Sequence, residues 1–293
     1  MKKCYLLLIL LVMVSALWAQ TERNDLPNYF KPGMPNRIER AEQLTPFFTA
    51  LLEKTRPVRV LHLGDSHVRG HVFTVTTRRE LETAWGSEAV TEAPITYRTT
   101  ALATETGKPG LVYNAYGING ATTSHFLSPE LLAMADTLQP DLLILSFGTN
   151  ESHAKGYNEE AHRAAMEQLI DSLSSRCTQA TIMLTTPPGE YLRRYVRRNG
   201  KRRTIRTSNP RTARAAAEIA RLAADRQLPL WDLYHIAGGE YACRNWSTGR
   251  YFRPDGVHFT HEGYALQGRL LARALLEATN ESEHYAETPA SSE

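Results

Sequence analysis

The chain has 293 residues, of which 42% are hydrophobic and 22% charged, and its 34 basic residues nearly balance its 31 acidic ones at a formal charge of +3. These proportions are typical of a globular protein, and they exclude a disordered chain, a collagen-like chain and a protein with many membrane spans. The length permits one large domain or two small ones, and the small net charge gives no reason to expect nucleic acid as a partner.

Residues 1–19 are expected to be a signal peptide. Lys2 and Lys3 precede an apolar run that reaches Trp18, and Ala19 is a small residue of the kind found at cleavage sites. The run is shorter than the roughly 20 residues that cross a bilayer, so we expect cleavage rather than retention as an anchor. The mature protein is then periplasmic or secreted, with no membrane span and a formal charge near 3 − 2 = +1.

The sequence contains three cysteines, and Cys4 leaves with the signal peptide. Cys177 and Cys243 remain, and in an oxidising compartment they either form a disulfide or stay as two buried thiols. Neither belongs to a C-x-x-C pair, so the cysteines do not indicate a zinc site.

Helical and extended segments alternate along the rest of the chain. In the first half of the chain, apolar spacing and turn residues predict a helix at 37–54 and strands at 58–63, 111–114 and 142–147. They then predict a helix at 159–175, a strand at 181–186, a helix from 210 to about 226, a strand at 228–234 and a helix at 260–276. The helix at 210 begins with Pro210 after Asn209, which is a favourable start. Strands that are apolar on both faces and separated by helices indicate an α/β protein with a parallel sheet covered on both sides. We expect a single domain at 37–280, followed by an acidic, disordered tail at 281–293.

Four short polar segments lie at or after the ends of these elements. They are Gly64-Asp65-Ser66-His67, Asn119-Gly120-Ala121, Gly148-Thr149-Asn150-Glu151 and Asp255-Gly256-Val257-His258. Ligands of an open parallel sheet bind beyond the carboxyl ends of its strands. Together the segments contain a serine, glycine N–H donors, an asparagine amide and an aspartate three residues before a histidine. Acyl transfer needs such a set, because it uses a nucleophile, a base, a group that orients the base and donors for an oxyanion.

In this order and spacing, the four segments resemble those of the SGNH (GDSL-type) hydrolase superfamily, and the resemblance covers the chain from about Val58 to Leu276. It implies a three-layer, flavodoxin-like fold with a five-stranded parallel sheet, and it implies no metal and no cofactor. Glu151 departs from the family pattern, which often has an aspartate there.

The resemblance also implies a role for each matching residue. Ser66 would be the nucleophile, His258 the general base and Asp255 the residue that holds the imidazole. The N–H groups of Ser66 and Gly120 and the side-chain amide of Asn150 would form the oxyanion hole. Taken singly, each residue has a structural explanation as a turn, a cap or a packed side chain, but all of these would have to hold at once.

Two other hydrolase classes fit the sequence less well. The segment from His62 to His67 contains Asp-x-His after a strand, as the first metal block of metallophosphoesterases does, but the downstream ligands are missing. An α/β-hydrolase would have a Gly-x-Ser-x-Gly elbow, which the sequence lacks.

The histidine after Ser66 gives the segment a resemblance to exported bacterial esterases that remove acetyl groups from peptidoglycan or other glycans. We therefore expect an O-acylated glycan or a small ester as substrate. His67 is a candidate for substrate binding, and the alternative is that His67 faces solvent on a helix. Other functions compatible with the sequence are hydrolysis of lipid or short-chain esters, O-acetyl transfer to a glycan through the same acyl-enzyme, and glycan binding without catalysis.

Residues 191–206, YLRRYVRRNGKRRTIR, contain eight basic side chains and no acid. Asn199-Gly200 is a two-residue turn signal, so we expect a basic hairpin after the fourth strand, on the active-site side. Arg197 and Arg198 are candidates for contact with an anionic polymer, and the alternative is a solvated arm that pairs with surface acids. An exported esterase has little use for nucleic acid, so we do not expect it as the partner.

Overall fold

The computed structural model describes residues 26–30, 34–69, 72–91 and 100–287. The expected signal peptide lies outside the described residues. The main sheet contains strands β1 (Ile38–Glu39), β2 (Pro57–Gly64), β4 (Thr100–Ala101), β6 (Gly110–Gly117), β7 (Leu142–Ser146), β8 (Thr181–Thr185) and β11 (Leu230–Trp231). Two small sheets pair β3 (Val90–Thr91) with β5 (Thr104–Glu105) and β9 (Tyr191–Arg198) with β10 (Lys201–Ser208).

The helices lie between these strands. They are α2 (Thr45–Glu53), α3 (Ser66–Arg69), α4 (Val72–Trp85), α5 (Pro129–Leu138), α6 (Thr149–His153), α7 (Glu159–Arg176), α8 (Pro210–Asp225), α9 (Leu233–Ile236), α10 (Ala242–Thr248) and α11 (His261–Glu287), with 3-10 turns η1 (Ala41–Leu44), η2 (Thr123–Leu127) and η3 (Gly239–Tyr241). None of the helices in the described part of the chain is both long and apolar enough to cross a membrane.

The strand order of the main sheet is β1-β11-β8-β7-β2-β6-β4. The five strands from β11 to β6 are parallel, while β1 and β4 add antiparallel edges. Numbered along the chain, the parallel strands lie in the order 2-1-3-4-5, which is the flavodoxin-like order. The expected fold with five parallel strands is therefore confirmed, and the two short edge strands were not foreseen.

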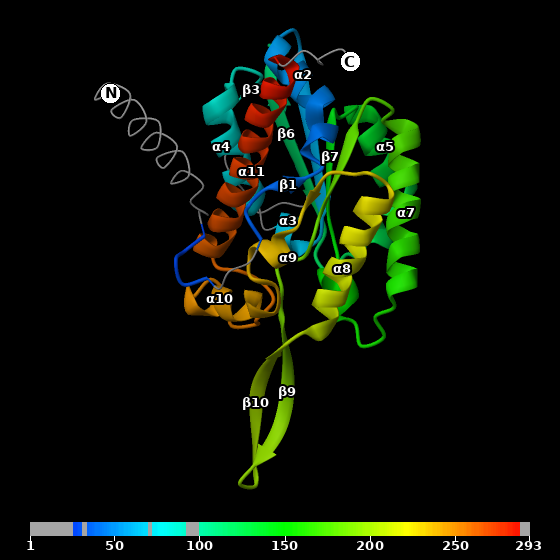
Figure 1. Cartoon of the computed structure of the whole chain (residues 1–293). Helices are drawn as coiled ribbons and strands as arrows, with labels where there is room; N and C mark the ends of the chain where they lie inside the picture. The colour runs from blue at the N-terminus through cyan, green and yellow to red at the C-terminus, as the bar shows by residue number, and fades with distance from the viewer. Residues whose placement is uncertain (1–25, 31–33, 70–71, 92–99, 288–293) are drawn as a thin grey trace, which may run out of the picture.

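The sheet separates two hydrophobic cores because successive side chains of a strand point to opposite faces. In β2, Val58 and Val60 pack into the core that α2, α4 and α11 cover. Leu61 and Leu63 belong to the other core, which α5, α7 and α8 cover. Figure 1 shows these helices on the two sides of the sheet. The molecule thus has three layers, and the carboxyl ends of the parallel strands remain uncovered by the two layers of helices.

Three of the expected element boundaries were wrong. The segment at 37–54 is not one helix, since Ile38–Glu39 is an edge strand and the α-helix begins only at Thr45. Pro46, in the first turn of α2, explains this, because proline is tolerated at a helix start but not in its interior. The last parallel strand is limited to Leu230–Trp231, since the Asp232 side chain caps α9.

The third wrong boundary is the end of the C-terminal helix. This helix, α11, continues to Glu287, so residues 281–287 of the expected disordered tail are helical. The remaining residues of that tail lie outside the described residues.

The two remaining cysteines do not form a disulfide in the structure. Both are buried as thiols, and their Sγ atoms donate to different carbonyls, Cys177 to Ala135 and Cys243 to Glu190. The alternative of two buried thiols is the one observed.

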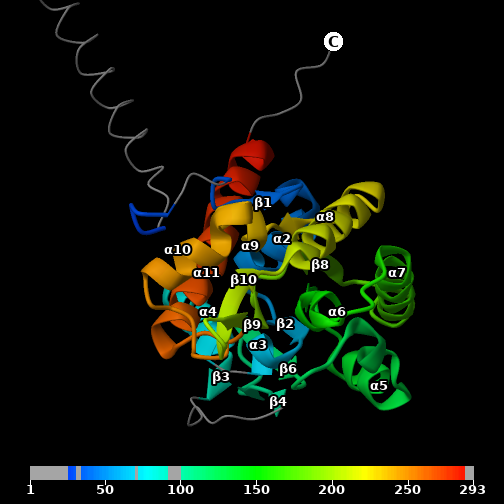
Figure 2. The same ribbon diagram turned by 90° about the horizontal axis from the view of Figure 1, so that it is seen from below.

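The expected basic hairpin is present as β9 and β10. Asn199 and Gly200 form its turn with φ of 52° and 72°, and Arg198 pairs with Lys201 across it. Positive φ at both turn residues is the requirement of a type I′ turn. Figure 1 shows that the hairpin extends away from the body of the molecule, and Figure 2 shows it end-on over the end of the sheet near α3.

Candidate active site

Ser66 is the first residue of α3, immediately beyond the carboxyl end of the central strand β2. The turn between the two elements needs Gly64. A Cβ atom there would lie 2.4 Å from Val68 Cγ2 and 2.7 Å from the carbonyl oxygen of Ser146, so only glycine allows α3 to pack this closely on the strand end. Ser66 is 9% exposed, so only a small part of it reaches solvent from this tightly packed turn.

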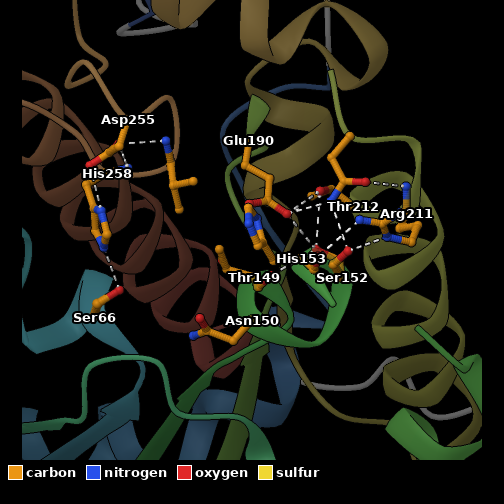
Figure 3. A network of polar contacts seen from close by, with 12 residues as sticks. Ser66, Thr149, Asn150, Ser152, His153, Glu190, Arg211, Thr212, Asp255 and His258 are labelled. Carbon is orange, nitrogen blue, oxygen red and sulfur yellow. Dashed lines mark hydrogen bonds and ion pairs between the residues drawn. The ribbon is translucent and has the colours of Figure 1, made fainter. Parts of the chain in front are cut away.

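The structure brings Ser66 together with His258 and Asp255, although they are far apart in the sequence. Ser66 Oγ donates to His258 Nε2 at 2.9 Å, and His258 Nδ1 donates to Asp255 Oδ2 at 3.0 Å. Figure 3 shows this chain of hydrogen bonds on one side of the site. The second contact fixes the imidazole tautomer in which Nε2 can accept the serine proton.

A short loop before α11 positions the acid and the base. The Asp255 Oδ1 atom accepts the backbone N–H groups of Val257 at 2.8 Å and His258 at 2.9 Å, so the aspartate also closes its own turn. Partial burial alone would raise the pKa of the Asp255 carboxyl, but these two N–H groups and the His258 side chain outweigh burial and lower the pKa below its ordinary value. Asp255 is therefore held as a carboxylate facing the imidazole.

The three expected oxyanion donors come from three different strand ends. The Ser66 N–H belongs to the first residue of α3, and Gly120 follows β6 in an exposed turn with φ of 73°. Asn150 lies in α6, where its Nδ2 donates to the carbonyl of Ala121 at 2.9 Å and to Asp65 Oδ2 at 3.3 Å. The Asn150 amide thus connects the segments of Ser66 and Gly120, and in Figure 3 it points to the side on which Ser66 lies.

Glu151, the departure from the family pattern, connects two of these segments. Its Oε2 accepts the N–H of Gly148 at 3.0 Å, which caps the start of α6. Its Oε1 accepts the N–H of Thr123 at 2.7 Å and the Thr123 hydroxyl at 2.8 Å. One carboxylate therefore joins α6 to the turn that follows Gly120.

The other end of α6 is held by residues at the start of α8. Arg211 Nε donates to the carbonyl of Ser152 at 2.7 Å, and Arg211 Nη2 donates to that of His153 at 3.1 Å. Asn209, which also caps α8, donates from Nδ2 to the same Ser152 carbonyl at 2.9 Å. A positive charge at a helix C-terminus is favourable, so these contacts stabilise the short helix that carries Asn150.

A buried carboxylate completes this network. Glu190 is 1% exposed, and its Oε1 accepts Asn209 Nδ2 at 2.6 Å and the Ser152 hydroxyl at 3.2 Å. Its Oε2 accepts His153 Nδ1 at 2.6 Å. Figure 3 shows the network on the side of Asn150 opposite Ser66. This network could not be predicted from the sequence, because its residues come from separate segments and no motif contains them.

His67 does not face solvent, so the alternative of an exposed helix residue is wrong. It is 6% exposed, its Nδ1 lies 3.0 Å from the Tyr264 hydroxyl, and its ring centroid lies 5.7 Å from that of His258. Burial lowers the pKa of His67 to about 3, so the ring is neutral. The neighbouring Asp65 is 1% exposed, and burial raises its pKa to about 8.

The residues of the rival metallophosphoesterase pattern do not converge. The two ring nitrogens of His62 contact the hydroxyls of Tyr113 at 2.8 Å and Ser146 at 2.7 Å, whereas Asp65 Oδ1 accepts the backbone N–H of His67. Across residues 26–30, 34–69, 72–91 and 100–287, no three His, Cys, Asp or Glu side chains are grouped so that they could hold a metal ion.

The two candidate arginines near the tip of the hairpin are not part of this cluster. Arg197 and Arg198 are exposed near the tip of β9. The base of the hairpin does reach the site, because Arg193 and Arg206 both donate from Nη2 to the carbonyl of Pro254, the residue before Asp255.

The chain is similar to known proteins in both sequence and structure. Residues 63–266 match the model of the GDSL-like lipase/acylhydrolase family. Among curated proteins, none matches the sequence significantly. A solved peptidoglycan O-acetylesterase has a TM-score of 0.66 at 17% identity over 82% of this chain and 97% of its own.

Two further solved structures are similar over much of the chain. An acetyl xylan esterase has a TM-score of 0.51 at 17% identity, over 74% of this chain and 99% of its own. A catalytic mutant of an acetylxylan esterase from Geobacillus stearothermophilus has a TM-score of 0.50 at 14% identity, over 74% of this chain and 94% of its own. At such identities the similarity establishes a shared fold.

The family match covers well over half of the chain and includes the four polar segments around Ser66. The fold has the flavodoxin-like strand order that the resemblance to this family implied. The chain therefore belongs to the GDSL-like lipase/acylhydrolase family, that is, to the SGNH hydrolases, and it is a carboxylic ester hydrolase.

Proposed function

We propose that the protein is an exported serine esterase that removes O-acetyl groups from a glycan, most specifically from cell-wall peptidoglycan. The observation that carries the proposal is the continuous hydrogen-bond chain from Ser66 Oγ through His258 to Asp255, in a chain of the acylhydrolase family. Export is supported by the charged and apolar residues at 1–19.

The first half of the reaction forms an acetyl-enzyme. His258 Nε2 takes the proton of Ser66 as the Oγ attacks the acetyl carbonyl. The developing oxyanion is stabilised by the N–H groups of Ser66 and Gly120 and by the Asn150 amide. His258 then returns the proton to the departing sugar hydroxyl, and the acetyl group remains on Ser66.

The second half releases the product. Water enters, and His258 removes its proton as the water oxygen attacks the acetyl-Ser66 carbonyl. His258 then returns this proton to the departing Ser66 Oγ, so that acetic acid leaves and the Ser66 hydroxyl is restored. A second sugar hydroxyl in place of water would make the protein an O-acetyltransferase. The same three side chains serve both reactions, so the acceptor decides between them.

Two observations support an acetylated glycan as the substrate class. The similar solved structures include a peptidoglycan O-acetylesterase and two acetyl xylan esterases. The eight basic side chains of the hairpin also favour a large anionic substrate over a small neutral ester. The exposed large apolar side chains of the described residues are scattered over separate elements, which gives no support to a lipid substrate.

The test measures acetate release by the mature protein from O-acetylated peptidoglycan, with 4-nitrophenyl acetate and butyrate as small esters and Ser66→Ala as the control. We expect acetate release that disappears in the variant. Activity on the nitrophenyl esters alone would move the natural substrate to another glycan or a lipid. Acetyl groups found on an added de-acetylated glycan, rather than free acetate, would establish transfer. A folded protein that is inactive in every assay would overturn the proposed function and favour glycan binding without catalysis.

A further inference from the structure

The two faces of the β9–β10 hairpin carry the same charge but differ in shape and position. Residues directly opposite each other in an antiparallel pair share one face, and the faces alternate along each strand. One face, which we call the tyrosine face, contains Tyr191, Arg193, Tyr195, Arg197, Arg202, Thr204 and Arg206. The opposite face, which we call the valine face, contains Arg194, Val196, Arg198, Lys201, Arg203 and Ile205. Each face therefore has four cationic side chains.

The tyrosine face is continuous with the catalytic loop. At its base, Arg193 Nη2 donates to the carbonyl of Pro254 at 2.7 Å, and its cross-strand partner Arg206 donates to the same oxygen. The backbone N–H of Tyr191 donates to the carbonyl of Gly256 at 2.8 Å. The contacted residues flank Asp255 on both sides. A chain molecule lying along this face therefore leads to the site of Ser66 and His258.

The hairpin cations have no acidic partner among the described residues. In the part of the chain that the structure describes, no carboxylate forms an ion pair with a basic side chain of residues 191–206. Instead the register places like charges opposite each other, as in the pairs Arg193–Arg206 and Arg197–Arg202. Directly opposed like charges destabilise a strand pair, so an anionic ligand would remove an unfavourable interaction. The pairing with surface acids that the alternative expects is therefore absent from the described part of the chain.

The tyrosine face also carries an exposed aromatic ring between its arginines. Tyr195 is 62% exposed, and the guanidinium of Arg202 lies 3.8 Å from its ring centroid. A guanidinium over the ring is a cation–π contact and keeps both groups in a fixed position on the surface. Aromatic rings pack against the C–H groups of sugars, and arginines bind carboxylates through paired hydrogen bonds. The valine face has no aromatic side chain beside its cations.

We infer that the tyrosine face binds a polyanionic glycan, whose carboxylates contact the arginines and whose sugar rings pack on Tyr195, and that it directs the chain toward Ser66. This inference rests on the proposed function for the reaction at Ser66, but binding itself is separable from it. The valine face serves as the matched control within the same hairpin, since it has equal charge and equal distance from the body of the molecule.

The experiment measures binding of polygalacturonate, a sugar polyanion without acetyl groups, by isothermal titration calorimetry. All variants are made in the mature Ser66→Ala protein, so that no catalytic turnover is needed. Arg197→Glu with Arg202→Glu reverses two charges of the tyrosine face, and Arg198→Glu with Arg203→Glu reverses two of the valine face. We expect the first pair to weaken binding at least about tenfold more than the second at near-physiological salt. Circular dichroism of both double variants checks that the hairpin and the domain remain folded.

Two further measurements identify the ligand chemistry. Tyr195→Ala keeps the charge, and we expect it to weaken binding of polygalacturonate but not of poly-L-glutamate, which has carboxylates without sugar rings. Equal losses for the two faces would show a non-specific basic arm and overturn the inference. It would also fall if poly-L-glutamate bound as tightly as polygalacturonate and Tyr195→Ala changed neither. Binding that survives while the acetate-release test fails would disprove the proposed function and leave the glycan-binding face in place.

Discussion

Asn150 is the residue whose catalytic assignment is most open to a simple test. Its amide bonds Ala121 and Asp65 in the structure, so it connects segments as well as facing the side of Ser66. Of the two hydrogen bonds, the one from Asn150 Nδ2 to Asp65 Oδ2 is the longer, at 3.3 Å. We propose that in the transition state this N–H group donates to the oxyanion instead of to Asp65. Removing a donor of this kind affects the chemical step more than the binding of the ester.

We expect Asn150→Ala to lower kcat on 4-nitrophenyl acetate by about 10²–10³ with a small change in KM. The measurement is steady-state kinetics, and urea unfolding of the variant shows how much of the loss comes from the bond to Ala121. Unchanged kcat in a folded variant would remove Asn150 from the oxyanion hole.

At the scale of elements, α6 is a five-residue helix that would be unstable alone. It is held at its start by Glu151 and at its end by Arg211 and Asn209. These side chains satisfy terminal N–H and carbonyl groups that a helix this short cannot satisfy itself. The position of Asn150 is therefore a property of this surrounding network as much as of its own segment.

Replacing Glu151 with alanine tests the network. The change leaves the N–H groups of Gly148 and Thr123 and the Thr123 hydroxyl without their acceptor, so we expect a loss of about 1–3 kcal/mol in the free energy of unfolding. We also expect a lower kcat, because α6 carries Asn150. Glu80→Ala, at an exposed position in the interior of α4, is the control and should change neither quantity. Equal effects of the two substitutions would contradict the role of Glu151.

At the scale of the whole molecule, folding buries ionisable groups whose protonation differs from that of the unfolded chain. His62 is fully buried between the hydroxyls of Tyr113 and Ser146, and burial lowers its pKa to about 3. His67 is lowered in the same way. Below a pH of about 6.5 the unfolded chain takes up protons that the folded protein does not, so the histidines make the folded state less stable as the pH falls from about 6.5 to about 3.

A variant isolates the contribution of one histidine. Each such group changes the free energy of unfolding by about 1.4 kcal/mol per pH unit inside that window. We expect His62→Gln, which keeps polar atoms near both hydroxyls, to reduce the slope of unfolding free energy against pH by about this amount between pH 6 and 4. Urea unfolding at several pH values measures the slope. Identical slopes in both proteins would mean that His62 titrates normally in the folded state.

The sequence was sufficient for the features that depend on local pattern. Alternating apolar strands and helices specified a parallel sheet covered on both sides, because a strand buried on both faces has no polar side to expose. The expectation of five parallel strands in a flavodoxin-like fold came from the resemblance to the SGNH hydrolases. The turn residues Asn199-Gly200 specified the hairpin, since few residues tolerate positive φ at two successive positions. Pro46 would also have corrected the expected helix at 37–54, had its place at a helix start been used.

Tertiary structure alone decided which distant residues meet. Asp255 and His258 are close in sequence. The 2.9 Å hydrogen bond between His258 Nε2 and Ser66 Oγ, however, depends on the packing of α11 against the sheet. The contacts of Glu151 and Glu190 join residues 28 and 37 positions apart, and no sequence period relates them. The two cysteines stayed apart because their elements pack in different places. Local pattern determines which face of each element is buried, whereas only the packed chain determines which buried and polar groups become neighbours.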